Sequence, residues 1–148
     1  MWKVFSRVTG VGLAMLLAGN AQADLVLSDA WLRAVPPVSP TMAGYVTVTN
    51  NGETPAIITG AHTEIAGHVM LHDMATQKDG TRKMRHLSRV EIPPGESVSF
   101  APAGIHLMLM HLSRVPVEGE SVSICIEQGP ESAVCSDFQV SRTSPFDA

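Results

Sequence analysis

The stretch Ile105-His106-Leu107-Met108-Leu109-Met110-His111 places an aliphatic side chain at every second position from Ile105 to Leu109. Successive side chains of a β-strand point to opposite faces, so Ile105, Leu107 and Leu109 share one face and the intervening His and Met residues share the other. The aliphatic face belongs to a core, because burial of apolar surface stabilises the fold. The stretch therefore predicts a half-buried strand with a strip of imidazole and thioether groups on its second face.

The rest of the chain has the same organisation. After Asp24, short apolar or alternating runs are broken every eight to twelve residues by Pro, Gly, Asn or Asp, and long helical periodicity is absent. This rhythm is typical of an antiparallel β-sandwich or barrel. We predict a single all-β domain over residues 24–140, an antiparallel Greek-key β-sandwich, followed by a loose tail over residues 141–148. The expected strands are Leu25–Val35, Ala43–Asn50, Ala56–Thr63, Gly67–Ala75, Lys83–Val90, Ser97–Phe100, His106–Leu112, Ser121–Glu127 and Ala133–Val140.

Residues 1–23 have the layout of a secretory signal peptide. Lys3 and Arg7 precede a short apolar run over residues 11–18, and Ala21-Gln22-Ala23 follows it. The run is shorter than the ~20 residues that a membrane-spanning helix needs. We expect cleavage after Ala23 and a soluble periplasmic protein that does not insert into the membrane. The remaining 125 residues suffice for one compact domain.

The charge of the chain argues against nucleic acid or anionic lipid as partners. Removal of residues 1–23 takes away two cations and changes the formal net charge from −4 to −6. Five of the eight remaining cations gather around one predicted hairpin, which is interpreted as a solvated tip or as a docking patch for an acidic partner surface. These cations are Lys78, Arg82, Lys83, Arg85 and Arg89.

Cys125 and Cys135 are the only cysteines of the chain, and they flank the turn signal Gln128-Gly129-Pro130. A hairpin at this turn would bring the two residues opposite each other, and paired thiols in an oxidising compartment are usually bridged. We therefore predict a Cys125–Cys135 disulfide. The alternative, a thiolate metal pair, is weaker because oxidation would remove its ligands.

A second His and Met strip lies on the predicted strand 67–75. His68, Met70, His72 and Met74 share one face of this strand. A three-residue loop at 78–80, with Gly80 in the left-handed conformation, would pair Gln77 with Thr81 and begin a hairpin.

The register of that hairpin decides which residues meet. It sets Met74 opposite Met84 and His72 opposite His86, so that Met84 lies diagonal to His72 at about 7–8 Å between backbones. A slip of one residue would turn Met84 to the other face, so this contact depends on the loop. The position of Met84 relative to His72 therefore tests the predicted register of the hairpin.

Imidazole with thioether sulfur is a ligand set for a soft metal ion. It suits Cu(I), whereas Ca²⁺ and Mg²⁺ prefer oxygen and Zn²⁺ rarely takes methionine. Methionine is also a common filler of cores, and a single His on a strand is more often hydrogen-bonded than metal-bound. Met74 shares a strand face with His72, and Met110 shares one with His106 and Met108, so both are interpreted as possible accessory ligands. The residues interpreted individually as structural are Met42, Met70, His62, His68, His86 and His111.

The chain resembles the PCu(A)C family of periplasmic copper chaperones. The spacing of His72, Met84, His106 and Met108, with eleven, twenty-one and one intervening residues, is similar to the metal motif of that family. The likeness covers roughly Asp24 to Val140. Supporting segments are Ala30-Trp31-Leu32-Arg33-Ala34, Ala43-Gly44-Tyr45, Thr49-Asn50-Asn51-Gly52 and Pro102-Ala103-Gly104-Ile105.

The resemblance implies a cupredoxin-like β-sandwich that binds one Cu(I) through His72, Met84, His106 and Met108. It further implies transfer of copper towards cytochrome c oxidase, through a copper-accepting assembly protein or directly to a subunit of the oxidase, by a monomer. Many relatives have a His- and Met-rich tail that holds Cu(II), but residues 141–148 contain neither residue type, which leaves a second copper site in doubt. Cys125 and Cys135 are outside the family motif.

Other functions are less consistent with the residues. A blue-copper centre needs a thiolate with His and Met shortly after it, and neither residue follows Cys125 or Cys135. An enzyme needs an acid, base or radical group beside the metal, and no such set stands out, so we predict that the protein is not an enzyme. General copper or zinc storage or tolerance, and a sandwich used only for protein interaction, stay open as alternatives.

Overall fold

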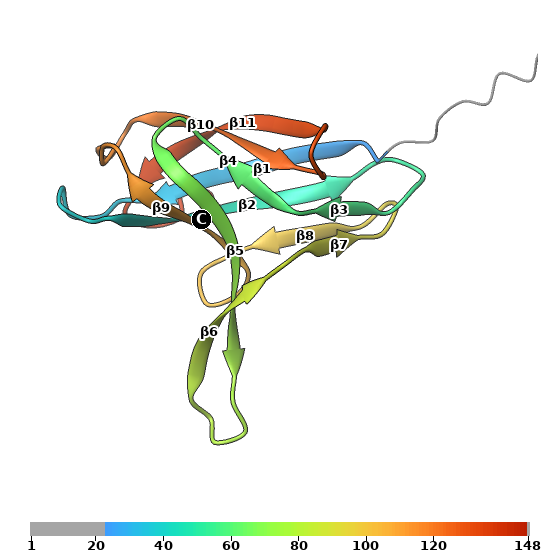
Figure 1. The fold of residues 1–148 in the computed structure, drawn as a ribbon, viewed down its shortest axis with the longest axis horizontal. Coiled ribbons are helices and arrows are strands. Elements are labelled where there is room, and N and C mark those ends of the chain that lie inside the picture. Colours follow the sequence, from blue (N-terminus) through green and yellow to red (C-terminus); the bar gives the residue numbers. More distant parts are fainter. Residues whose placement is uncertain (1–22, 148) are drawn as a thin grey trace, which may run out of the picture.

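A computed structural model describes residues 23–147, which form eleven β-strands and contain no helix that could cross a membrane (Figure 1). The predicted signal peptide lies outside the described residues apart from Ala23. The strands are β1 (Leu25–Arg33), β2 (Thr41–Asn50), β3 (Ala56–Ile58), β4 (Gly60–His62), β5 (Ala66–Thr76), β6 (Arg82–Leu87), β7 (Val90–Ile92), β8 (Ser97–Phe100), β9 (His106–Leu112), β10 (Ser121–Glu127) and β11 (Ala133–Ser141).

Seven strands close into a ring. The order β1-β11-β10-β4-β5-β9-β2 returns to β1 through an antiparallel β1–β2 pair, while β8 extends from β2 and β6 from β5. Neighbours that are distant in sequence, such as β2 and β9, require connections across the barrel, as in Greek-key folds. The predicted all-β architecture is confirmed, with one difference: β1 and β11 run parallel. The sandwich is therefore a closed, flattened barrel.

Two of the nine predicted strands differ from the observed ones. The prediction over residues 56–63 becomes β3 and β4, because the chain changes partners at Thr59: β3 pairs with β7, and β4 pairs with β10 and β5. The prediction over residues 83–90 becomes β6, and Val90 begins β7, a strand that was not predicted and that pairs with β3 instead of β5. An apolar pattern indicates that a segment is extended, but it does not indicate which neighbour the segment joins.

The core has the composition that the alternation predicts. Leu107 and Leu109 of β9 are completely buried, and Leu71 of β5 is 1% exposed. On the far side of the barrel, Cys125 and Cys135 lie opposite each other in β10 and β11 and form the predicted disulfide, with Cα atoms 3.8 Å apart. The barrel is thus fixed by a continuous apolar interior and by one covalent link.

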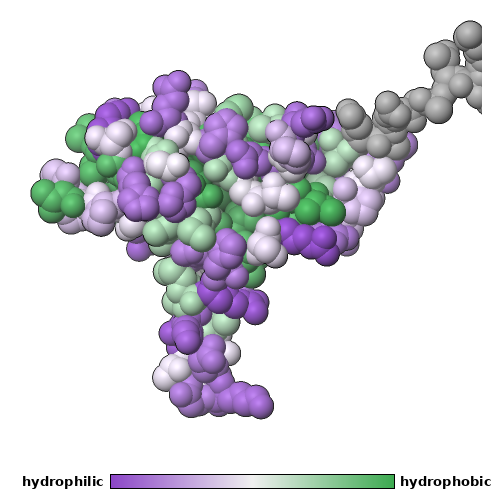
Figure 2. All heavy atoms as spheres, viewed as in Figure 1, coloured by the Kyte–Doolittle hydropathy of each residue, from purple (hydrophilic) through white to green (hydrophobic). Residues whose placement is uncertain are grey.

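The hairpin of β5 and β6 leaves the barrel as a projecting arm (Figure 1). Its register is the predicted one: the Gln77 amide donates to the Thr81 carbonyl at 2.7 Å, and Gly80 has a φ of +83°. Asp79 accepts hydrogen bonds from the Thr81 hydroxyl and amide at 2.6 and 3.0 Å, which hold the pKa of Asp79 below its ordinary value. Towards the tip the surface of the arm is hydrophilic (Figure 2), so the arm is ordered by hydrogen bonds more than by packing.

Candidate metal centre

His72 lies at the point where β5 passes from the barrel into the arm. It is paired with His106 of β9 on one side and with His86 of β6 on the other. The ring centroids of His72 and His106 are 5.8 Å apart and those of His72 and His86 are 6.1 Å apart, both with nearly perpendicular rings. Three imidazoles from three strands therefore form one row across the sheet.

Met84 completes the arm side of this row. Its Sδ lies 3.1 Å from Nδ1 of His72, as the hairpin register predicts, and the Met84 side chain is 44% exposed. Burial lowers the pKa of His72 below its ordinary value, and the charges of His106 and His86 lower it further. A depressed pKa keeps the imidazole of His72 neutral, which is the form that binds a metal ion.

His106 is the fixed member of the row. It is 5% exposed, and its Nδ1 lies 3.0 Å from the carbonyl oxygen of Gly104. A carbonyl only accepts, so Nδ1 carries the hydrogen and the lone pair of the neutral ring is on Nε2. The ring of Tyr45 lies 6.5 Å away on β2, and burial raises the pKa of this phenol despite the opposing charge of Arg33. His106 is thus oriented by a backbone hydrogen bond, which is how proteins fix a ligating imidazole.

Met108 is placed by strand register. It lies two residues after His106, on the same face of β9, where it pairs with Met70 of β5 and Ala43 of β2. The side chain is half-buried. The four residues predicted as ligands therefore occupy one face of three adjacent strands. His72 contacts Met84 and faces His106.

The two residues predicted as possible accessory ligands, Met74 and Met110, lie in different places relative to the row of imidazoles. Met74 pairs with Met84 on the arm and so lies next to the row of imidazoles. Met110 pairs with His68 and Thr41, two residues beyond Met108 in the opposite direction. The structure thus brings Met74 towards the row and Met110 away from it.

One member of the row, His86, and one neighbour of it, Tyr45, were not among the candidate ligands predicted from the sequence. His86 was interpreted individually as structural, although the predicted register already set it opposite His72. Tyr45 gave no metal signal, and only the pairing of β2 with β9 puts its ring beside His106. The hairpin register was the available signal for His86, whereas no pattern along the chain predicts the contact of Tyr45.

One tight loop connects the arm with His106. Residues 101–105 join β8 to β9, and Ala103 within this loop has a φ of +70°. The carbonyl of Ala103 accepts a hydrogen bond from the guanidinium of Arg82 on the arm, and the next carbonyl, that of Gly104, accepts from His106. The loop therefore contacts both the arm and the His106 ring.

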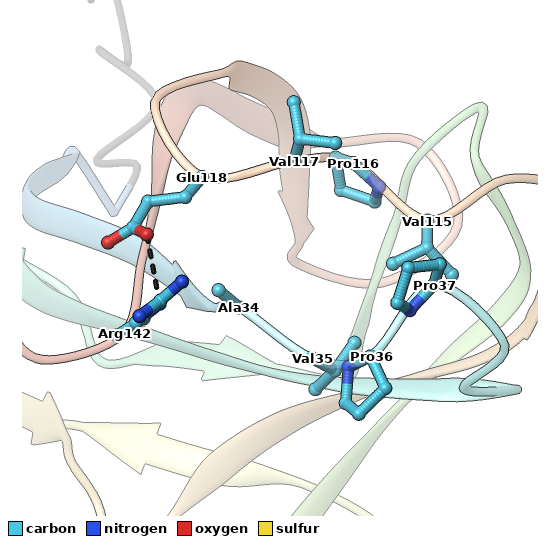
Figure 3. A pocket seen from close by; sticks show the side chains of 9 residues that line it. All are labelled: Ala34, Val35, Pro36, Pro37, Val115, Pro116, Val117, Glu118 and Arg142. Atoms are coloured by element: carbon cyan, nitrogen blue, oxygen red, sulfur yellow. Dashed lines mark ion pairs between the residues drawn. The ribbon is translucent and has the colours of Figure 1, made fainter.

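Other hollows of the surface offer little to a metal ion. A groove of about 420 Å³ runs between residues 34–37 and 115–118, lined mainly by Val, Pro and Ala (Figure 3). Its one carboxylate, that of Glu118, is paired with Arg142 at 3.0 Å. In the part of the chain that the structure describes, no three His, Cys, Asp or Glu side chains are grouped to hold an ion.

Solved structures define the class of protein to which this fold belongs. The PCuAC domain of PmoF1 in its apo form matches with a TM-score of 0.65 and 21% identity, over 80% of this chain and 94% of that domain. CuI-DR1885 from Deinococcus radiodurans matches with a TM-score of 0.63 and 28% identity, over 90% of this chain and 87% of DR1885. The fold is the cupredoxin-like barrel of PCuAC domains, and the resemblance to that family is confirmed.

Residues 25–140 match the family model described as "Putative lipoprotein LpqE-like", so the chain belongs to the LpqE-like family. A relative in Leifsonia xyli subsp. xyli (strain CTCB07), "Putative lipoprotein Lxx21020", is 35% identical over 122 residues, which are 78% of this chain and 72% of the relative. The family thus covers the whole barrel and the arm.

Proposed function

We propose that the protein is an exported copper chaperone that binds one Cu(I) through His72, Met84, His106 and Met108. The observation that carries the proposal is the convergence at the base of the arm: Sδ of Met84 lies 3.1 Å from Nδ1 of His72, and the His106 ring faces His72. CuI-DR1885, the copper-loaded neighbour at 28% identity, supports this assignment.

The distances are compatible with a shared ion. With metal–nitrogen and metal–sulfur bonds of about 2.0 and 2.3 Å, two donors of one tetrahedral ion lie roughly 3–4 Å apart, and two imidazole centroids roughly 5–6 Å apart. The observed separations are 3.1 Å for His72 and Met84 and 5.8 Å for the two rings. Soft sulfur with borderline nitrogen favours Cu(I) over hard cations.

The ligand set also suits transfer. Two imidazoles and two thioethers are neutral, so a thiolate-bearing acceptor would hold Cu(I) more strongly and drive the ion out of this site. Methionine remains a competent ligand in an oxidising compartment such as the periplasm. We infer delivery to a copper-accepting protein in the assembly of cytochrome c oxidase, as the resemblance to the PCu(A)C family implies.

The arm provides a surface for meeting that acceptor. From Asp73 to Arg89 the chain carries five cations and two anions, a net charge of +3, and Met84 lies among them. A basic surface around an exposed ligand favours approach of an acidic partner and speeds encounter. The rate of copper transfer should therefore fall as ionic strength rises, whereas an uncharged encounter would leave it unchanged.

Competition with bicinchoninate for Cu(I), repeated in the presence of Zn²⁺, tests the proposal. We expect tight Cu(I) binding that excess Zn²⁺ does not displace, and a loss of about 100-fold or more in affinity for Met84→Ala, because a direct ligand should matter at least as much as an outer-shell partner. Lys83→Ala, the adjacent exposed position on the opposite face of β6, is the matched control and should bind normally.

Two outcomes would favour the alternatives. Preferential retention of Zn²⁺ would point to a general metal-storage protein, since methionine is a poor zinc ligand. Equal Cu(I) affinity of Met84→Ala and the parent protein would remove the ligand assignment, and no Cu(I) binding by the parent protein would leave an interaction domain.

A further inference from the structure

The outer face of the β5–β9 pair carries only His and Met over three successive pairs. His72 pairs with His106, Met70 with Met108, and His68 with Met110. The first pair and Met108 belong to the site proposed above. The remaining three residues continue the same strip of nitrogen and sulfur donors along the barrel, beyond the reach of the arm.

His111 joins the far end of this strip through an unusual backbone. Simple alternation would direct its side chain away from that of Met110, but His111 has a φ of +53°, in the left-handed region that non-glycine residues rarely adopt. Its ring is exposed, and its centroid lies 4.9 Å from that of His68. The left-handed conformation therefore accompanies a close pair of imidazoles.

Gly67 provides the room for this arrangement. A Cβ at position 67 would lie 3.0 Å from the Cβ of His111, tighter than ordinary van der Waals contact. Glycine at this position thus lets the backbone of β5 approach His111 closely. The missing Cβ at position 67 therefore allows the close approach of the two strands at the place where the rings of His68 and His111 are paired.

The two imidazoles are not held by other partners. His62 is bound to the Glu127 carboxylate at 2.7 Å, and His106 to the Gly104 carbonyl. Within residues 23–147, by contrast, the imidazoles of His68 and His111 make no hydrogen bond, and the two rings contact each other. Both imidazoles are exposed, so their ring nitrogens are accessible to a ligand.

We propose that His68, His111 and Met110, with Met70 at the edge, form a second Cu(I) site. The donor types are the same as in the first site, and the centroid separation of 4.9 Å is close to the roughly 5–6 Å expected for two imidazoles on one ion. The site is open, and neither imidazole is oriented by a backbone carbonyl. It binds about 10- to 100-fold more weakly than the first site, the loss typical of removing an outer-shell partner.

The two sites are adjacent on one strip of the barrel. Met70, at the edge of the second site, pairs directly with Met108 of the first. Residues two apart on a strand are separated by about 7 Å, so the paired imidazoles of the two sites lie two such steps apart.

Anaerobic titration of the purified protein with Cu(I), using bicinchoninate as competitor, tests the proposal. We expect two ions per chain in two phases, and loss of the weaker phase alone in the double variant His68→Asn/His111→Asn. Asn tolerates the left-handed conformation of position 111, so the apo protein should melt as the parent does. A single ion in the parent protein, or two ions in the double variant, would overturn the second site.

Three further variants separate this proposal from the function proposed above. Met84→Ala should lose the tighter phase and retain the weaker one, so failure of the first site leaves the second measurable. His62→Asn removes an exposed imidazole that is held by Glu127 and should leave both phases unchanged. Met110→Leu, which keeps the volume and removes the sulfur, should weaken the second phase only; an unchanged second phase would exclude Met110 as a ligand.

Discussion

The barrel and the projecting arm differ in what holds their side chains in place, although β5 runs through both. In the barrel, residues 66–72 of β5 pair with β9, and the adjacent His106 is 5% exposed. In the arm, residues 73–76 of β5 pair only with β6, and Met84 is 44% exposed. The candidate metal centre therefore combines one rigid half and one half that depends on the order of a hairpin.

The two regions also differ in charge. The arm segment from Asp73 to Arg89 has a net charge of +3, whereas the other residues from Asp24 onward carry three cations and twelve anions, a net charge of −9. The ion pair of Arg85 with Asp73, at 2.9 Å, is exposed and contributes little to stability. The positive charge of the arm therefore contributes little to the stability of the fold.

Core residues and candidate metal ligands lie on different faces of the same strands. On β9, Leu107 and Leu109 face the core, and His106 and Met108 face the candidate metal centre. The same division holds for Leu71 and His72 on β5. Substitutions on the two faces should therefore have separable effects.

The largest expected effect on the free energy of unfolding comes from truncating a core side chain of the barrel. Leu107→Ala should lower the free energy of unfolding by about 2–5 kcal/mol, because a completely buried leucine leaves a cavity. Met108→Ala, one residue away, should lower Cu(I) affinity with a much smaller effect on unfolding. Urea denaturation of both variants checks this, and similar destabilisation by both would show that the two faces are not separate.

The disulfide is the next largest contribution, and it is confined to the barrel. Replacing Cys125 and Cys135 with Ser should lower the free energy of unfolding by about 2–3 kcal/mol, since the bond closes a short loop with a sequence separation of 10. Cu(I) affinity should be unchanged, because the bond joins β10 to β11 rather than the strands of the metal centre. A thermal melt with a parallel bicinchoninate titration measures both; a large fall in affinity would mean that the barrel transmits strain to the arm.

The sequence predicted much of the division between the core face and the candidate-ligand face of these strands. The alternation in residues 105–111 predicted which side chains of β9 enter the core, and the three-residue loop predicted the register that brings Met84 to His72. Both inferences depend on the fixed period of a strand and on turn geometry, which are local. The contact of Cys125 with Cys135 followed from a turn in the same way.

Other features depend on pairings between distant segments. The division at Thr59, the parallel β1–β11 pair and the contact of Tyr45 with His106 all arise from which strands become neighbours. Nothing in the local pattern specifies these choices. The φ of +53° at His111 is of the same kind, because simple alternation predicts the opposite direction for its side chain.

A smaller effect is expected from the titration of His72 in the metal-free protein. Its pKa in the folded state is lowered by burial and by the neighbouring imidazoles, so below about pH 6.5 the unfolded chain takes up a proton that the folded protein resists. Stability should therefore fall as the pH drops below that value, and His72→Asn should reduce this loss. Denaturation at pH 7.5, 6.5 and 5.5 compares the two proteins; parallel pH profiles would show that His72 does not contribute.

The smallest effect tests the link between the two regions. Arg82→Ala removes the hydrogen bond to the Ala103 carbonyl and leaves the strand pairing of β6 intact. Because the contact is exposed, we expect a change of less than about 1 kcal/mol in unfolding and a loss of only a few-fold in Cu(I) affinity. Lys83→Ala, which removes a neighbouring cation without that contact, is the control for charge. If Arg82→Ala weakens binding and Lys83→Ala does not, the loop over residues 101–105 helps to hold the arm against His106; if the two variants behave alike, the strand pairs at His72 are enough to position Met84.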